Sequence, residues 1–166
     1  MASDIFAKIG DIKGESLDDK HKDEIEVLSF SWGVTNAEII SGGGGGVGAG
    51  KATFQDLSFV HILDKASPSL LKACASGTHI KDAIITHRKA GKGQQEYLIV
   101  KLNDVIITGV THGGSSRQPI SENLTMAFGK VDGAQLTEKA QHVLGSLTGE
   151  LGKIVAEKPA LPEAAE

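Results

Sequence analysis

One segment of this 166-residue chain could bind phosphate, because it is rich in glycine and ends in a lysine. Residues 45–51 match all but the last position of a nucleotide-binding P-loop, in which backbone N–H groups and the lysine hold phosphates. The next residue is Ala52, so the hydroxyl that would bind the metal ion is missing. Apolar and polar residues alternate after Lys51 with a period of two, which predicts a strand. A phosphate site needs a helix N-terminus instead. We therefore expect a flexible loop and no nucleotide.

The other reactive side chains show no spacing typical of a catalytic or metal site. The histidines form no H-x-x-x-H pair and have no carboxylate at metal-ligand spacing; they are His21, His61, His79, His87, His112 and His142. Cys74 is the single cysteine, so no internal disulfide can form, and its apolar surroundings predict a small buried hydrophobe. No G-x-S-x-G motif surrounds a serine. The sequence predicts no enzyme, no metal and no cofactor.

The charge and hydropathy of the chain argue against two classes of partner. The net charge is −4, so the basic excess of a nucleic-acid-binding protein is missing. No stretch of about 20 apolar residues is present, so we expect no membrane insertion. Residues 1–11 are charged and lack an apolar signal-peptide core. We expect a chain that is made in the cytoplasm and exported, if at all, outside the general secretory route.

The elements that must position any site are mostly strands. The chain has 21 glycines and many short apolar runs, which indicate many turns and a mainly β fold. The alternation patterns predict strands at 4–9, 24–34, 51–63, 82–89, 96–102, 105–111 and 121–131. Glycine-containing loops are expected at 11–21, 41–50 and 113–119, and a hairpin turn at 90–93.

One short helix is predicted by its end signals. Ser67 is a candidate N-cap, Pro68 suits the first helical position, and Gly77 suits the residue after the last turn. The expected apolar side of this helix consists of Leu70, Leu71 and Cys74.

The C-terminal part differs in pattern from the rest. Its apolar residues recur at helical spacing, and Asp132 with Gln135 resembles a capping box; these apolar residues are Leu136, Ala140, Val143, Leu144, Leu147, Leu151, Ile154 and Val155. The last residues are rich in Pro, Ala and Glu, which predicts disorder. We therefore divide the chain into a β domain (1–131), an amphipathic helical extension (132–157) and a disordered tail (158–166).

The predicted strand at 24–34 has two distinct faces. Phe30 and Trp32 point to one side, and Ser29 and Ser31 point to the other. An apolar face and a small hydroxyl face suit a sheet with a core on one side and water on the other. From the residues alone, Ser29 and Ser31 are interpreted as an ordinary solvated surface.

Several runs of this sequence resemble one known family. The run I-G-D-I-K-G-E-S, followed by H-K and then by I-E-V-L-S-F-S-W-G, is similar to the haemolysin-coregulated proteins (Hcp), the tube subunits of the bacterial type VI secretion system. The resemblance continues in order through 42–51, 55–59, 64–68, 73–77, 88–91 and 96–99, and covers roughly residues 1–130. It implies a small antiparallel β-barrel with one flanking α-helix.

The resemblance also implies an assembly with no catalytic turnover. Family members form homohexameric rings that stack into a tube. A contractile sheath propels this tube from a baseplate, and a spike trimer sits at its tip. The implied cargo is effector proteins held in the lumen, and the implied destination is outside the cell. A rival reading is that the C-terminal extension binds an adaptor or acts like an effector. Another is a monomeric ligand-binding β-barrel, which its native mass would distinguish.

The resemblance assigns three groups of site residues. Ser29 and Ser31 are expected to face the lumen and contact effectors. The inter-subunit loop is expected to contain Gly42, Gly43, Gly44, Gly45, Gly46 and Lys51. The ring-stacking loop is expected to contain Asp11, Lys13, Glu15 and Asp18.

Overall fold

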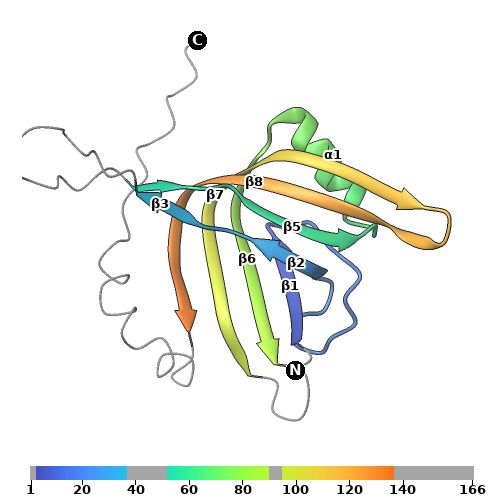
Figure 1. Cartoon of the computed structure of the whole chain (residues 1–166), viewed down its shortest axis with the longest axis horizontal. Coiled ribbons are helices and arrows are strands. Elements are labelled where there is room, and N and C mark those ends of the chain that lie inside the picture. The colour runs from blue at the N-terminus through green and yellow to red at the C-terminus, as the bar shows by residue number, and fades with distance from the viewer. Residues whose placement is uncertain (1–2, 37–51, 90–94, 137–166) are drawn as a thin grey trace, which may run out of the picture.

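The computed structural model describes residues 3–36, 52–89 and 95–136. The chain forms a closed antiparallel barrel with one helix, which confirms the predicted mainly β fold (Figure 1). The elements are β1 (Ser3–Ile9), β2 (Ile25–Ser31), β3 (Val34–Asn36), β4 (Ala52–Phe54), β5 (Leu57–Ile62), α1 (Ser67–Ser76), β6 (His79–Lys89), β7 (Glu96–Ser115) and β8 (Gln118–Leu136).

The barrel closes in the order β1-β2-β5-β8-β7-β6, and β3 pairs with β4 in a separate two-stranded sheet. Alternate residues of each strand point inward, because successive side chains of a strand point to opposite faces. The fully buried large apolar residues of the core include Ile9, Ile25, Leu57, Phe59, Leu70, Ile85, Leu102, Ile107, Leu124 and Met126. This interior leaves no lumen inside the single subunit, since side chains fill a barrel of this size.

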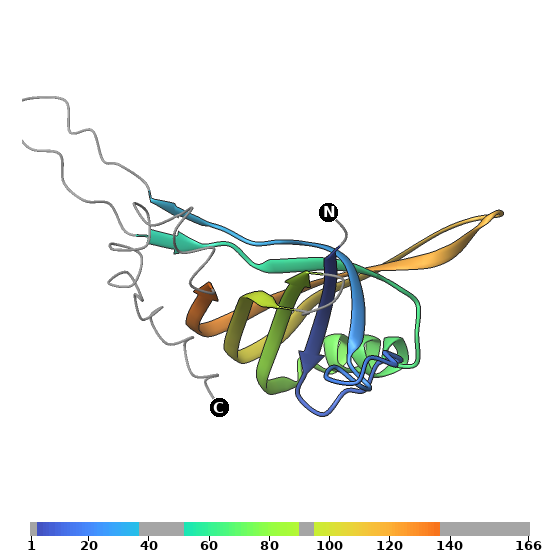
Figure 2. The same cartoon turned by 90° about the horizontal axis from the view of Figure 1, so that it is seen from below.

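Helix α1 lies against one end of the barrel (Figure 2). Leu70 and Ala73 face the core and Cys74 packs against it, whereas Leu71 is exposed, so the predicted apolar side is wrong only at Leu71. Cys74 is only partly buried at the edge of the core, and not the fully buried residue that its context predicted. Gly77 ends the helix in the left-handed conformation with φ of 61°, as its position predicted.

The start of α1 differs from the prediction. The N-cap position is Ala66, and the Ser67 hydroxyl makes no cap hydrogen bond to the helix. The Ser67 Oγ instead accepts a hydrogen bond from the backbone N–H of Asp64 at 3.2 Å. The Asp64 carboxylate accepts one from the backbone N–H of Ala66 at 2.9 Å. The Ser67 hydroxyl that we assigned to the cap therefore stabilises the turn before the helix instead.

Two predicted strands are each divided in the structure. The strand expected at 24–34 ends at Ser31 and resumes as β3, and the strand expected at 51–63 is divided into β4 and β5. The break lies where the backbone N–H of Gln55 donates to the carbonyl of Gly33 at 2.9 Å. β3 and β4 therefore leave the barrel together as a two-stranded arm, seen on the left of Figure 1.

The strands predicted at 96–102 and 105–111 are one strand, β7, in which Asp104 has a positive φ of 52°. The hairpin between β6 and β7 is confirmed by their antiparallel register. The predicted loop at 113–119 is wrong, because Ser115 pairs with Gln118 and the strands continue almost to the turn. Figure 2 shows this β7–β8 hairpin extending well beyond the barrel.

The predicted helix starting at Asp132 is wrong over its first five residues, because β8 continues to Leu136. Ala134 pairs with Val100, Gln135 with Ile99 and Leu136 with Leu98. Continued pairing provides hydrogen-bond partners for the backbone N–H and C=O groups of β7 and β8. These hydrogen bonds stabilise the strand more than a local capping pattern would stabilise a helix. The rest of the predicted extension, 137–157, and the predicted tail, 158–166, lie outside the described residues.

Candidate functional site

Ser29 and Ser31 are both exposed on the outer face of β2, as the alternation predicted. A β-bulge between Val27 and Ser29 changes the phase of the strand. Before the bulge Val27 points inward, and after it Phe30 packs against the core. The extra residue, Leu28, is left 60% exposed.

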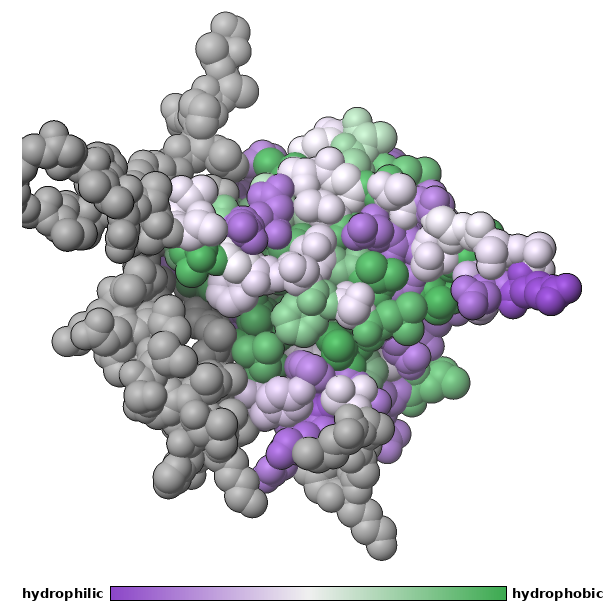
Figure 3. Space-filling view, viewed as in Figure 1, coloured by the Kyte–Doolittle hydropathy of each residue, from purple (hydrophilic) through white to green (hydrophobic). Residues whose placement is uncertain are grey.

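The register places further small polar residues beside these serines. Ser31 pairs with Ser58 of β5, which pairs with Thr125 of β8. Val60 of β5 pairs with both Ser29 and Asn123, and Asn123 pairs with Thr111 of β7. We call this surface the hydroxyl face, and it consists of Ser29, Ser31, Ser58, Thr111, Asn123 and Thr125. Figure 3 shows a strongly hydrophilic tip on the β7–β8 hairpin.

The six side chains of the hydroxyl face are uncharged, whereas the chain as a whole is 23% charged. Val60 lies among them, and Asp56, just before β5, accepts a hydrogen bond from Thr108 Oγ1 at 3.3 Å. Hydroxyl and amide groups offer many weak hydrogen bonds and no fixed charge, so they suit a surface that contacts varied partners. Sequence reasoning found only the two β2 serines. The period-two pattern of 57–62 marks Ser58 as outward-facing, but only the register shows that it adjoins Ser31.

A buried ionic cluster lies where the β7–β8 hairpin leaves the barrel. Glu122 of β8 and His61 of β5 are both fully buried, and His61 Nε2 lies 2.7 Å from Glu122 Oε1. His112 Nε2 of β7 lies 2.5 Å from Glu122 Oε2. Each carboxylate oxygen of Glu122 therefore lies within hydrogen-bond distance of one imidazole Nε2. Burial raises the pKa of the nearby Asp64, whose Oδ1 lies 4.0 Å from His61 Nδ1.

A second ionic cluster holds the loop between β1 and β2 to the barrel. The Arg88 side chain of β6 is 2% exposed and donates hydrogen bonds to both carboxylate oxygens of Asp18, its Nη1 at 2.9 Å. The Arg88 guanidinium lies 4.8 Å from the centre of the Phe6 ring and 3.5 Å from Asp4 Oδ2. The hydrogen bond from Arg88 holds the pKa of Asp18 well below its usual range.

The structure places the residues of the predicted ring-stacking loop in different environments. Asp11 is exposed at the turn after β1. Lys13 lies 3.7 Å from Asp23, and Glu15 accepts a hydrogen bond from the backbone N–H of Lys65 at 3.0 Å. Asp18 binds Arg88 within the subunit, so its carboxylate is occupied by an internal contact. The predicted inter-subunit loop, including Lys51, lies outside the described residues.

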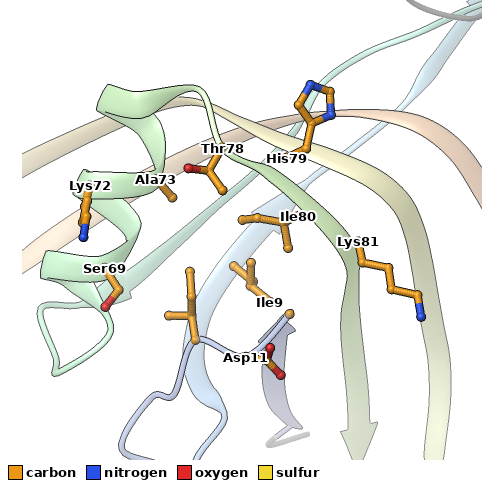
Figure 4. Close-up of a pocket in the computed structure, with 11 residues that line it drawn as sticks. Ile9, Asp11, Ser69, Lys72, Ala73, Thr78, His79, Ile80 and Lys81 are labelled. Carbon is orange, nitrogen blue, oxygen red and sulfur yellow. The ribbon is translucent and has the colours of Figure 1, made fainter.

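A pocket of about 360 Å³ lies between α1, the turn after β1 and the start of β6 (Figure 4). Ile9 and Ile80 form its apolar floor, and Asp11, Lys72 and Lys81 lie on its rim. Gly10 fits here with φ of 48°, because an added Cβ would come within 2.9 Å of Ile80 Cγ2. The pocket is open and shallow, and its rim charges are of mixed sign.

In the described ranges, no three His, Cys, Asp or Glu side chains are grouped so that they could hold a metal ion. The same part of the chain contains no helix that is long and apolar enough to span a membrane.

Comparison with known proteins agrees with this description. A family model described as "Type VI secretion system effector, Hcp" matches residues 6–134. The chain belongs to the Hcp family. It is 47% identical over 142 residues to the protein hcp1 of Pseudomonas aeruginosa, covering 84% of this chain and 87% of that protein.

Solved Hcp structures also share the fold. The crystal structure of Hcp1 from Salmonella typhimurium is 42% identical, with a TM-score of 0.66 over 79% of this chain and 84% of that one. A type VI secretion system effector from Yersinia pestis is 41% identical, with a TM-score of 0.65 over 77% of this chain and 86% of that one. This Hcp chain is therefore a subunit of the type VI secretion tube, and its family is a structural one whose members are secreted.

Proposed function

We propose that this Hcp chain forms hexameric rings that stack into the inner tube of the type VI system and carry effector proteins in the lumen. The observation that carries this proposal is the hydroxyl face, a set of six uncharged polar residues on four adjacent strands. If this surface faces a central channel, it makes weak contacts with many cargo proteins and offers no deep pocket to any of them. Ser29 and Ser31 then belong to the cargo-contacting surface.

A ring of identical subunits needs two different patches that fit each other, because its contacts run head to tail. The arm formed by β3 and β4 supports this, since it leaves the barrel on one side and has no core of its own (Figure 1). An isolated two-stranded hairpin is marginally stable in water, so the arm gains from contact with a neighbour. The sheath, baseplate and spike are the further partners that this role requires, and export needs no signal peptide.

The native mass of the purified chain tests the ring. We expect light scattering after gel filtration to give about six times the 17.3 kDa chain mass, and negative-stain images to show rings. A single-chain mass at micromolar concentration would contradict the proposal and favour a monomeric ligand-binding barrel.

Changing Ser58 to glutamate tests the cargo surface separately. The substitution Ser58→Glu places one carboxylate per subunit on an uncharged face, so the ring would present a circle of negative charge to the cargo. We expect the ring mass to be unchanged and the amount of effector that copurifies to fall at least about tenfold. The matched control is Gln118→Glu, which adds the same single charge at an exposed β8 residue outside the hydroxyl face. Equal cargo loss in both variants would contradict the assignment of this face.

A further inference from the structure

One row of side chains joins three strands where the β7–β8 hairpin leaves the barrel (Figure 2). Glu122 of β8 pairs with His61 of β5 on one side and with His112 of β7 on the other. Residues paired in this way point to the same face of a sheet, so the three side chains lie together. The ladder between β5 and β8 ends one position further, at Ile62 and Ser121, and the hairpin continues beyond it. The row is therefore the attachment of the hairpin to the barrel.

The contacts of this row need protons. Glu122 Oε1 lies 2.7 Å from His61 Nε2, and Glu122 Oε2 lies 2.5 Å from His112 Nε2. On the other side of the His61 ring, Nδ1 lies 4.0 Å from Asp64 Oδ1 and has no hydrogen-bond partner among the described residues. A ring nitrogen and a carboxylate oxygen attract each other only when one of them carries a proton, because two lone pairs repel. Three contacts thus need three protons.

The number of protons available depends on the pH. A neutral imidazole has one N–H, and a protonated imidazole has two. With both histidines neutral and both carboxylates ionised, two protons serve three contacts, and one lone pair of His61 faces a carboxylate. One further proton, on His61 or shared with Asp64, completes the set. Water does not replace this proton, because the His61 side chain is fully buried and an unsatisfied buried polar group is costly.

The charges around this row favour the additional proton. The ionisable groups around His61 and Asp64 come from four elements; they are Glu122 (β8), His112 (β7), Lys65 (the turn after β5) and Glu15 (the loop between β1 and β2). β2 places the uncharged Val27 opposite His61, and α1 has no acidic residue in its first turn. Lys65 is directed elsewhere, with its Nζ 3.3 Å from Asp23 Oδ1. Burial, together with the nearby carboxylates, raises the pKa of Asp64.

We propose that His61, Glu122, His112 and Asp64 form a proton-operated latch that holds the base of the β7–β8 hairpin. The closed latch binds one proton more than the open one, in which these groups meet water. A proton that binds the closed state more tightly stabilises that state at low pH, and the stabilisation is lost as the pH rises. An imidazole in water titrates near pH ~6.5, so the latch is complete below this pH and loosens as the pH rises above it. The latch belongs to the single subunit and does not depend on the proposed ring.

Hydrogen exchange of the full-length chain at two pH values tests the latch. After correction for the intrinsic exchange rate, we expect the protection of residues 110–113 and 121–123 to fall about tenfold between about pH 6 and about pH 8.5. Residues 83–86 of β6 are the internal reference, because they pair with β1 and β7 away from the row. Their protection should change by less than about twofold.

Two variants separate the proton from the packing. His61→Gln keeps an N–H for Glu122 but takes up no proton in this range, so the tenfold fall should disappear. His112→Gln is the matched control, because it replaces the 40% exposed histidine of the same row and leaves His61 in place. This control should retain the fall. A fall that persists in His61→Gln, or that is absent from the parent, would overturn the proposal.

Asp64→Asn is the gentler test, because it leaves the buried contact between His61 and Glu122 in place. The variant removes the carboxylate that faces His61 Nδ1, so the additional proton is bound less tightly. We expect the fall in protection to shrink to about threefold or less. An unchanged tenfold fall would show that Nδ1 is not the site of the proton and would overturn the latch as proposed.

Discussion

Replacing Glu122 by alanine is expected to lower the free energy of unfolding by about 4 kcal/mol, because the change leaves buried polar atoms without hydrogen-bond partners and a cavity in place of the side chain. Glu122 and His61 are both fully buried, and the Glu122 carboxylate also lies 2.5 Å from His112 Nε2. Without it, His61 loses its 2.7 Å hydrogen bond. Its other ring nitrogen, Nδ1, already has no hydrogen-bond partner among the residues that the structure describes.

Urea unfolding at neutral pH measures this effect, and His79→Ala is the control. His79 also lies 2.9 Å from a carboxylate, that of Asp104, but both side chains are more than half exposed. An exposed pair contributes about 0–1 kcal/mol, so the control should unfold almost like the parent. A loss below about 1 kcal/mol for Glu122→Ala would mean that water reaches the cluster. Hydrogen exchange at 112–121 should rise in Glu122→Ala, because the cluster lies at the base of the hairpin.

Replacing Arg88 by methionine is expected to cost about 3 kcal/mol and to release the loop between β1 and β2. The substitution keeps an apolar stem but removes both hydrogen bonds to Asp18 and the contact over the Phe6 ring. Because Asp18 keeps some access to water, we expect a smaller loss than for Glu122. Urea unfolding gives the energy, and faster hydrogen exchange at 12–24 would show the loop opening. Unchanged exchange there would contradict the anchoring role.

The dependence of the free energy of unfolding on pH in the acid range reports the same contact between Arg88 and Asp18. The Arg88 guanidinium lowers the pKa of Asp18 from its ordinary value of 3.8, so the folded state favours the carboxylate. This contribution is complete above pH 3.8 and is lost as the pH falls below it. Asp18→Asn lacks the titrating group, so its stability should fall less steeply below pH 4 than that of the parent. Parallel slopes would contradict the assigned ion pair.

The features that the sequence predicted correctly depend on neighbouring residues. The exposure of Ser29 and Ser31 follows from a two-residue period, and the end of α1 at Gly77 follows from one residue that tolerates positive φ. The family assignment rests on many short runs at consistent spacing, and the family model confirms it over residues 6–134. The first two signals are each contained in a short stretch of chain, and the third is a series of such stretches in a fixed order.

The features that the sequence did not predict depend on contacts between distant residues. Asp18 was assigned to a stacking loop, but the fold brings it to Arg88, 70 positions away. His61 and Glu122, 61 positions apart, meet only because β5 and β8 are neighbours in the barrel. Residues 132–136 have a helical pattern, yet pairing with β7 makes them a strand.

The sequence by itself determined the family, the β class and the chemistry of the serine-bearing strand, since alternation and motif order are encoded locally. Only the tertiary structure decided which strands adjoin and which charges neutralise one another. The reason is that strand register is set by long-range backbone hydrogen bonds and core packing, which no local pattern specifies.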